Sequence, residues 1–223
     1  LDSIILQNCS YKEDPSLLTL VYAYPRISIA IILAVSMTLL SLLLGILLIH
    51  SRKTKEIRTM SETDALTGLY NRRAAEDHIT RQMQEDGRNP GCVRPLISID
   101  LDKFKQVNDT YGHLEGDALL IAVADTLRTS VRSSDIVGRI GGDEFVVYLT
   151  NVTDRQNAMA VADKLCQVIR ELSTMKKEWS NISASIGISF ADHPNIKMEE
   201  LYISADKAMY SAKENGRNQY QTL

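Results

Sequence analysis

Apolar and polar residues divide the chain into two parts with different patterns. No charged side chain occurs between Ile27 and Ile49. A helix of that length spans about 35 Å at about 1.5 Å per residue, which is enough to cross a bilayer. From residue 64 onward, short apolar runs alternate with amphipathic stretches. The pattern therefore predicts one membrane-spanning helix at 25–49 and a globular domain at 64–223.

The globular part alternates predicted helices and strands. Helices are expected at 71–84, 103–108, 116–130, 154–172 and 198–213, and strands at 95–100, 135–140, 145–149, 180–190 and 218–222. The helix at 154–172, for example, carries its apolar residues on one face of a 3.6-residue period. A hairpin inside a helix–strand alternation is typical of an α/β (α+β) fold. We therefore expect a mixed, mainly antiparallel central sheet flanked by helices.

The charges on either side of the apolar run indicate its orientation. Acidic residues precede it and basic residues follow it: Asp2, Glu13 and Asp14 before, and Arg52, Lys53, Lys55 and Arg58 after. The positive-inside rule then puts the globular domain in the cytoplasm. A cleaved signal peptide, the alternative, would have a shorter apolar core preceded by positive charge. We expect 1–24 to be the remnant of an extracytoplasmic region and 50–63 a helical linker, either a dimer contact or a solvated spacer.

Charge and cysteine content narrow the classes of function. Beyond residue 50 the acidic and basic residues nearly balance, so no nucleic-acid-binding surface is predicted. The cysteines Cys9, Cys92 and Cys166 have neither the paired spacing of a metal site nor the density of a disulfide scaffold. Cys92 and Cys166 are interpreted as packing residues, whereas Cys9 would be free to link two chains.

The first candidate site is the run Gly141-Gly142-Asp143-Glu144-Phe145. A diglycine supplies positive φ angles at little steric cost, so it would close a tight hairpin between the flanking strands. Asp143 and Glu144 would then lie at or just past the turn. Two adjacent carboxylates held there indicate a bound cation, and a solvated hairpin tip is the alternative.

The second candidate site follows the predicted strand at 95–100, in Asp100-Leu101-Asp102. A carboxylate at the end of a central strand, near a second one on a hairpin, would bind one or two divalent ions. An EF-hand loop is excluded because Phe104 stands where the third ligand of the loop is required. Asp100 is the preferred ligand, whereas Asp102 would either join the site or cap the following helix.

Several ordered motifs together resemble the GGDEF domain of diguanylate cyclases, from Asp64 to Tyr220. The blocks are Asp64-Ala65-Leu66-Thr67-Gly68-Leu69-Tyr70-Asn71-Arg72-Arg73, Asp100-Leu101-Asp102-Lys103-Phe104-Lys105 with Asn108-Asp109, Gly112-His113-Leu114-Glu115-Gly116-Asp117, the pentapeptide at 141–145, Ser185-Ile186-Gly187-Ile188, and Ala205-Asp206-Lys207-Ala208-Met209-Tyr210 with Ala212-Lys213-Glu214-Asn215-Gly216-Arg217-Asn218. Ala75 departs from the bulkier residue common there. The resemblance implies a fold similar to nucleotidyl cyclases and polymerase palms, and an enzyme that joins two GTP molecules into cyclic di-GMP with release of pyrophosphate.

The resemblance also implies the roles of the acids. Mg²⁺ or Mn²⁺, two ions per site, would be held by the carboxylates of Asp100 and Asp143 and by the backbone carbonyl of Leu101. Asp143 would also accept the proton of the ribose 3′-hydroxyl, and Glu144 would help to position the metal or the hydroxyl. Lys105 would stabilise the phosphate charge in the transition state.

The remaining substrate contacts are expected on the predicted helices. The backbone amide of Phe104 would add a positive field at a helix N-terminus. Asn108 and Asp117 would accept hydrogen bonds from guanine, which distinguishes GTP from ATP. His113 would lie either near the nucleotide or in the core. By resemblance, Lys213 and Arg217 would grip the β- and γ-phosphates, with a solvated helix end as the alternative for both.

A further expectation concerns regulation and partners. Arg132 and Asp135, at their offset before Gly141, match the family's inhibitory site for cyclic di-GMP, and a surface salt bridge is the alternative. Because each site would hold one GTP, activity would require a homodimer. The expected location is the inner membrane of a bacterium. The other functions considered are a catalytically silent receptor for GTP or cyclic di-GMP, and a cyclase with a mononucleotide product.

Overall fold

The computed structural model describes residues 24–60, 62–88, 91–191 and 196–223, without the side chains of 48–60. It divides into two compact units, Leu1–Met60 and Ser61–Leu223.

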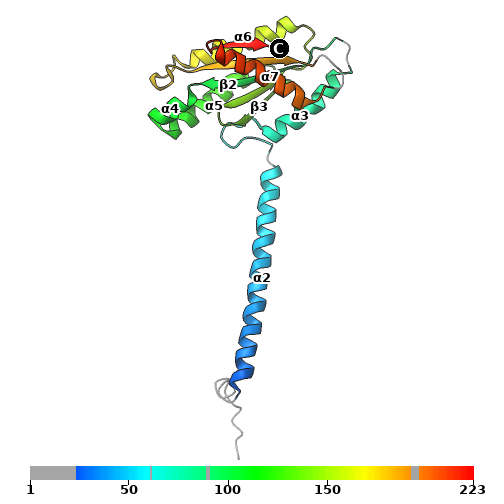
Figure 1. The fold of residues 1–223 in the computed structure, drawn as a ribbon, viewed down its shortest axis with the longest axis vertical. Coiled ribbons are helices and arrows are strands. Elements are labelled where there is room, and N and C mark those ends of the chain that lie inside the picture. Colours follow the sequence, from blue (N-terminus) through cyan, green and yellow to red (C-terminus); the bar gives the residue numbers. More distant parts are fainter. Residues whose placement is uncertain (1–23, 61, 89–90, 192–195) are drawn as a thin grey trace, which may run out of the picture. The chain divides into compact units, whose positions relative to one another are not determined.

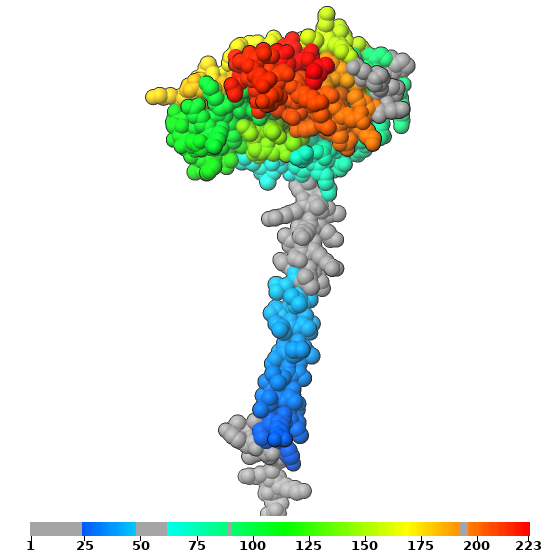
Figure 2. Space-filling view, in the orientation of Figure 1, coloured from blue at the N-terminus to red at the C-terminus, as the bar shows by residue number. Residues whose placement is uncertain are grey.

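The described part of the first unit is a single helix, α2, Pro25–Met60. Its stretch Pro25–Leu47 has a mean hydropathy of 2.7 and is long and apolar enough to cross a membrane, by length and composition. This stretch is the blue column in Figure 2, and its large apolar side chains are exposed all around the helix. A helix that is apolar on every side is typical of a membrane span or of a helix buried by other protein.

The second unit is built on a six-stranded sheet. The strands are β1 Tyr70–Asn71, β2 Pro95–Asp102, β3 Ile136–Gly141, β4 Glu144–Tyr148, β5 Ser183–Phe190 and β6 Gln219–Thr222, in the order β1-β3-β4-β2-β5-β6. The three central pairs, β3–β4, β4–β2 and β2–β5, are antiparallel, whereas the outer pairs β1–β3 and β5–β6 are parallel. The predicted mixed, mainly antiparallel sheet is therefore confirmed.

Helices cover both faces of this sheet (Figure 1). They are α3 Arg72–Asp86, α4 Phe104–Tyr111, α5 His113–Ser130, α6 Arg155–Leu172 and α7 Met198–Glu214, with a 3-10 turn at Lys177–Trp179. On one face, which we call the α7 face, buried residues of α3 and α7 pack on Leu96, Val146 and Tyr148 of the sheet. On the other, the α6 face, α5 and α6 pack on the remaining apolar residues of the same strands.

The two-residue period of β2 decides which of its side chains reach each face. Ile97, Ile99 and Leu101 are buried in the core of the α6 face. Because side chains alternate along a strand, Asp100 and Asp102 both point to the α7 face. This alternation places two carboxylates side by side under helix α7.

Some boundaries differ from the predicted ones. Strand β2 extends past Asp100 because Asp102 pairs with Ser183 of β5, a partner that local pattern cannot reveal. The short edge strand β1 was not predicted, and Asn71 precedes α3 as its N-cap, accepting a 3.0 Å hydrogen bond from the amide of Ala74.

Gly187 of β5 provides a test of the packing of α7. An added Cβ there would lie 1.9 Å from the carbonyl oxygen of Ala205 and 2.2 Å from the amide nitrogen of Met209. Because both atoms are backbone of α7, the whole helix would have to move. We expect Gly187→Ala to lower the free energy of unfolding by about 3 kcal/mol, measured by urea denaturation followed through the fluorescence of Trp179.

The matched control is Gly45→Ala in α2, where an added Cβ meets nothing within 4 Å. This control should leave the unfolding of the second unit unchanged. A Gly187→Ala variant as stable as the parent would show that α7 does not pack this closely on β5.

Candidate active site

The hairpin between β3 and β4 presents the first acids. Gly141 pairs with Glu144, which leaves Gly142 and Asp143 as a two-residue turn. Gly142 has a φ of 55°, a left-handed conformation that favours glycine. Asp143 therefore lies in the turn and Glu144 begins β4, so the position predicted for these residues is confirmed.

An arginine that was not predicted holds this turn in place. Arg139 of β3 donates from Nε and Nη2 to the carbonyl oxygen of Gly142, at 3.0 and 2.7 Å, and from Nη1 to Oδ1 of Asp64 at 3.0 Å. Burial would raise the pKa of Asp64, but hydrogen bonds from Thr67 and Arg139 outweigh it and lower that pKa. The turn that carries Asp143 is thus tied to the loop that opens the domain.

The carboxylates converge where β2 ends beside the hairpin. Asp100 of β2 is the register partner of Glu144 of β4, so the two side chains share the α7 face. The amide of Leu101 donates a 3.3 Å hydrogen bond to the carbonyl oxygen of Asp143, which brings the turn against the end of β2. The side chain of Leu101 is buried, so only its backbone is available to this site.

Burial and mutual repulsion change the titration of these acids. The pKa of Glu144 is raised first by burial and then by the charges of Asp100, Asp206 and Asp143. The pKa of Asp100 is also raised, mainly by burial, although an ion pair with Lys213 opposes the shift. The Nζ atom of Lys213 lies 2.8 Å from Oδ2 of Asp100. The arrangement therefore concentrates negative charge and would gain from a bound cation.

The structure overturns one of the two interpretations of Asp102, the helix cap. The residue before α4 is Lys103, which has a φ of 63° and makes no side-chain capping bond, so the capping interpretation is wrong. Asp102 lies within β2, buried, and accepts hydrogen bonds from Ser183 and Ser185 of β5. Its pairing with β5 carries the strand beyond the point where a cap would be needed.

The predicted nucleotide contacts lie on α4 and α5. Phe104 and Lys105 form the first turn of α4. The side chain of Asn108 packs closely against Gly116, because a Cβ added to Gly116 would lie only 1.9 Å from Oδ1 of Asn108. His113 and Asp117 are exposed at the start of α5, so the interpretation of His113 as a core residue is wrong. These residues lie on two consecutive helices that pack against each other.

The donor set of the site fits a hard divalent cation. Asp100, Asp143 and Glu144 offer only oxygen ligands, which suit Mg²⁺ or Mn²⁺. Among the residues that the structure describes, no three His, Cys, Asp or Glu side chains lie close enough together to hold a metal ion by themselves. Mg²⁺ commonly takes one or two protein carboxylates and completes its shell with water and substrate phosphates, so these residues fit that metal.

Around Glu144 lie residues that sequence reasoning missed. Arg72 of α3 and Tyr202 and Asp206 of α7 interact electrostatically with its carboxylate. Tyr202 and Asp206 are four residues apart, a spacing that places them on one face of a helix. The spacing alone does not show that this helix face lies against the hairpin. Its position there depends on the close packing of α7 on Gly187.

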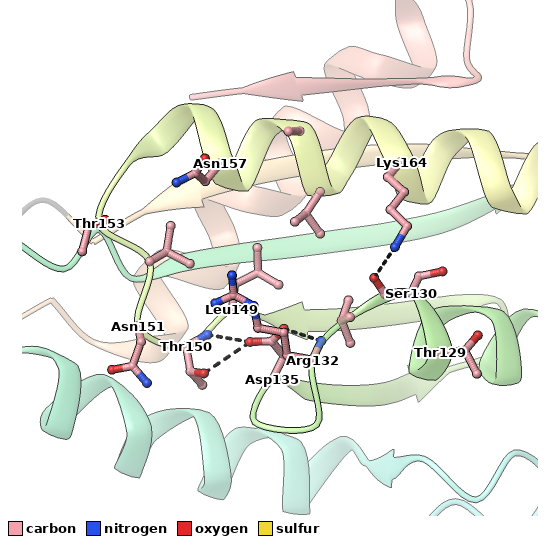
Figure 3. Close-up of a pocket in the computed structure, with 14 residues that line it drawn as sticks. Thr129, Ser130, Arg132, Asp135, Leu149, Thr150, Asn151, Thr153, Asn157 and Lys164 are labelled. Atoms are coloured by element: carbon pink, nitrogen blue, oxygen red, sulfur yellow. Dashed lines mark hydrogen bonds between the residues drawn. The ribbon is translucent and has the colours of Figure 1, made fainter.

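The predicted inhibitory residues lie away from the acids, at the start of β3. Arg132 and Asp135 line an open hollow of about 720 Å³ between this segment, residues 149–153 and helix α6 (Figure 3). Asp135 accepts hydrogen bonds from the backbone amides of Arg132 and Thr150, each 2.9 Å. Lys164 of α6, a second cation that was not predicted, lines the same hollow and donates to the carbonyl oxygen of Ser130 at 2.8 Å.

Comparison with known proteins identifies the family. The family described as "Diguanylate cyclase, GGDEF domain" matches residues 61–219. The chain is 40% identical over 170 residues to the bifunctional diguanylate cyclase/cyclic di-GMP phosphodiesterase MucR of Pseudomonas aeruginosa, covering 76% of this chain and 24% of MucR. It is 37% identical over 176 residues to the diguanylate cyclase DgcS of Shewanella oneidensis, covering 78% of this chain and 57% of DgcS.

Solved structures agree with this match. The coiled coil and GGDEF domain of DgcB from Caulobacter crescentus, in complex with c-di-GMP, superimposes with a TM-score of 0.66 at 25% identity, covering 88% of this chain and all of that one. The active GGEEF domain of a diguanylate cyclase from Vibrio cholerae gives 0.62 at 30% identity, covering 68% and 96%. The chain belongs to the GGDEF family, and it spans between about a quarter and just over half of the two curated relatives.

The raised pKa of Glu144 predicts a dependence of stability on pH. The folded state binds the Glu144 proton more readily than the unfolded chain, so stability falls as the pH rises from the ordinary glutamate pKa, about 4.3, through the raised one. Glutamine stays neutral. In the presence of a chelator, Glu144→Gln should therefore unfold at a higher temperature than the parent at neutral pH, and the difference should vanish at acidic pH.

Glu85→Gln, at an exposed position on α3, is the control and should follow the parent at every pH. A Glu144→Gln variant that unfolds at a lower temperature than the parent at neutral pH would show that the ionised carboxylate stabilises the fold.

Proposed function

We propose that this chain is a diguanylate cyclase that condenses two GTP molecules into cyclic di-GMP and two pyrophosphates. The observation that carries the proposal is the convergence of acids on the α7 face. Asp100 and Glu144 lie opposite each other in register, and the Arg139-held turn presents Asp143 beside them. Family membership, and relatives named for this activity, support the same conclusion.

The acids would prepare the 3′-hydroxyl for attack on the α-phosphorus. Asp100, Asp143 and the backbone carbonyl of Leu101 would hold Mg²⁺ or Mn²⁺, with Glu144, in register with Asp100, as a further oxygen donor. The ions, two per site, would neutralise the phosphate charge and lower the pKa of the hydroxyl. Asp143, in the hairpin turn next to Glu144, would accept the hydroxyl proton, as the family resemblance implies. Each attack forms one phosphodiester bond and releases one pyrophosphate.

The cations around the acids would bind the triphosphate. Lys213 pairs with Asp100 at 2.8 Å in the structure, and Arg217 lies 3.7 Å from Asp102. Lys213, in the last turn of α7, would bind the β- and γ-phosphates together with Arg217. Lys105 and the amide of Phe104, in the first turn of α4, would add positive charge near the reacting phosphate.

The guanine base would bind at the α4–α5 group. Asn108 and Asp117 would accept hydrogen bonds from the N1–H and the 2-amino group, donors that adenine lacks in this pattern. His113, exposed beside them, would contact the nucleotide. Because one site holds one GTP and the product contains two, two chains would meet with their sites face to face, and activity would require a homodimer.

The N-terminal unit would anchor and align these dimers. We assign residues 25–49 to a membrane span, 50–63 to a linker and 64–223 to the catalytic domain. The extracytoplasmic segment expected at 1–24 lies, except for Tyr24, outside the described residues. The apolar stretch Pro25–Leu47 and the basic residues that follow it support an inner membrane location with the domain in the bacterial cytoplasm. Holding two chains in one membrane raises their local concentration and favours the dimer.

The hollow beside Arg132 would bind the product as an inhibitor. Asp135 is held by backbone amides, and the exposed Arg132 and Lys164 provide two positive charges for phosphates. Relatives solved in complex with c-di-GMP support product binding by this domain.

Turnover by the purified 223-residue chain in detergent, with GTP and Mg²⁺, tests the proposal. Asp143→Asn removes the proton acceptor while keeping its size, so production of cyclic di-GMP should fall by about a thousandfold. GTP affinity should remain within a few fold. Asp125→Asn, exposed on α5, is the control and should match the parent.

Two outcomes would count against these assignments. Turnover that survives in Asp143→Asn would move the proton acceptor to another residue. If a dimeric parent chain binds GTP but produces no cyclic di-GMP, the chain is a catalytically silent receptor and not an enzyme.

Product inhibition is tested with Arg132→Ala. The variant loses one of the two cations of the hollow, so the concentration of cyclic di-GMP that halves the rate should rise about tenfold or more. For each variant, the inhibited rate is compared with the initial rate of the same variant before product accumulates. The control is Arg170→Ala, at an exposed position on α6, and the cyclic di-GMP concentration that halves its rate should equal that of the parent. Unchanged inhibition in Arg132→Ala would show that the hollow is not the inhibitory site.

A further inference from the structure

Asp102 is a buried acid for which the proposed chemistry has no role. Its side chain is 1% exposed. Oδ1 accepts a 2.8 Å hydrogen bond from Ser185, and Oδ2 accepts bonds from Ser183 at 2.6 Å and from the backbone amide of Asn218 at 3.2 Å. A buried carboxylate is strongly destabilising unless donors satisfy it. These three donors satisfy it, and one of them belongs to the segment that leaves helix α7.

That segment has an unusual backbone. Gly216, Arg217 and Asn218 have φ angles of 110°, 64° and 49° in succession. Two adjacent non-glycine residues in the left-handed region cost energy and persist only when their surroundings hold them there. The amide of Arg217 donates to Ala212 at 3.0 Å, and the amide of Asn218 donates to Asp102. The buried carboxylate is thus an anchor at the far end of the left-handed segment.

The same carboxylate also faces the side chain of Arg217. Nε of Arg217 lies 3.7 Å from Oδ1, an ion pair rather than a hydrogen bond. The arginine side chain is 56% exposed, so its guanidinium is available to a ligand. Two residues earlier on β2, Asp100 pairs with Lys213. Two acids on strand β2 therefore pair with two cations, Lys213 in the last turn of α7 and Arg217 in the segment that follows it.

We propose that Asp102 is a positioning residue for the triphosphate. Without touching the nucleotide, it fixes the left-handed segment so that Arg217 is held beside Lys213 for the β- and γ-phosphates. This inference rests on the proposed function of the site. The two acids of the Asp100-Leu101-Asp102 run would then have different roles. Asp100 would bind the metal, whereas Asp102 would orient the phosphate-binding Arg217.

The test is Asp102→Asn in the full chain, with affinities measured for a non-hydrolysable GTP analogue, GDP and GMP. Asparagine keeps the size but removes the charge and presents N–H donors where acceptors are needed. Affinity for the GTP analogue should fall about tenfold. Affinity for GMP, which lacks the β- and γ-phosphates, should stay at the parental value. In turnover, the KM for GTP should rise more than kcat falls.

A purely structural role predicts a different result. Loss of folded protein would reduce binding of all three nucleotides by the same factor and lower the melting temperature, without changing their ratio. Asp77→Asn, exposed on α3, is the matched control and should behave as the parent. Ser183→Ala and Ser185→Ala each remove one donor and should shift the ratio in the same direction by a smaller factor, which keeps the test available should Asp102→Asn fail to fold.

An equal loss for the GTP analogue and GMP, or no loss for either, would overturn the inference. These affinities are measured without turnover. A parent chain that binds GTP but makes no cyclic di-GMP would therefore refute the proposed function. The role of Asp102 would still be tested by the ratio of the affinities for the GTP analogue and GMP.

Discussion

Two carboxylates lie in register on the central strands β2 and β4, and their mutual repulsion constrains how the neighbouring segments pack. Asp100 and Glu144 face each other across β2 and β4, where burial makes their charges costly. Antiparallel pairing alone would not maintain such an arrangement, because like charges directly opposite each other destabilise a sheet. The surrounding residues must compensate for this repulsion. The same unfavourable charge density makes the place receptive to a divalent cation.

The compensation comes from segments distant in sequence. Arg139 ties the hairpin turn to Asp64 at the opening of the domain, so the turn keeps its position despite the repulsion. Lys213 reaches Asp100 from the last turn of α7. It can do so because α7 packs closely on Gly187 of β5, which has no side chain to hold the helix away. Stability of the sheet and placement of the site charges are therefore parts of one packing arrangement.

Much of the fold was predictable because its signals are local. The alternating helices and strands, the diglycine hairpin and the helix at Arg155–Leu172 follow from periodicity and turn chemistry. The errors occur where the deciding partner is remote. Asp102 could have been a helix cap or a site residue, and the cap is wrong because pairing with Ser183 keeps Asp102 in the strand. His113 could equally have been a core residue, and only the packing of α5 leaves it exposed.

The amino-acid order alone shows which chemical groups are present and how they are spaced: acids at a strand end and a turn, two cations four residues apart around the end of a helix, and an apolar run long enough for a membrane. Local chain geometry suffices for those conclusions. Three relations come from the folded arrangement alone: Glu144 faces Asp100, Arg139 holds the turn, and Lys164 shares a hollow with Arg132. These relations depend on strand register and helix packing between distant segments, which no local pattern encodes.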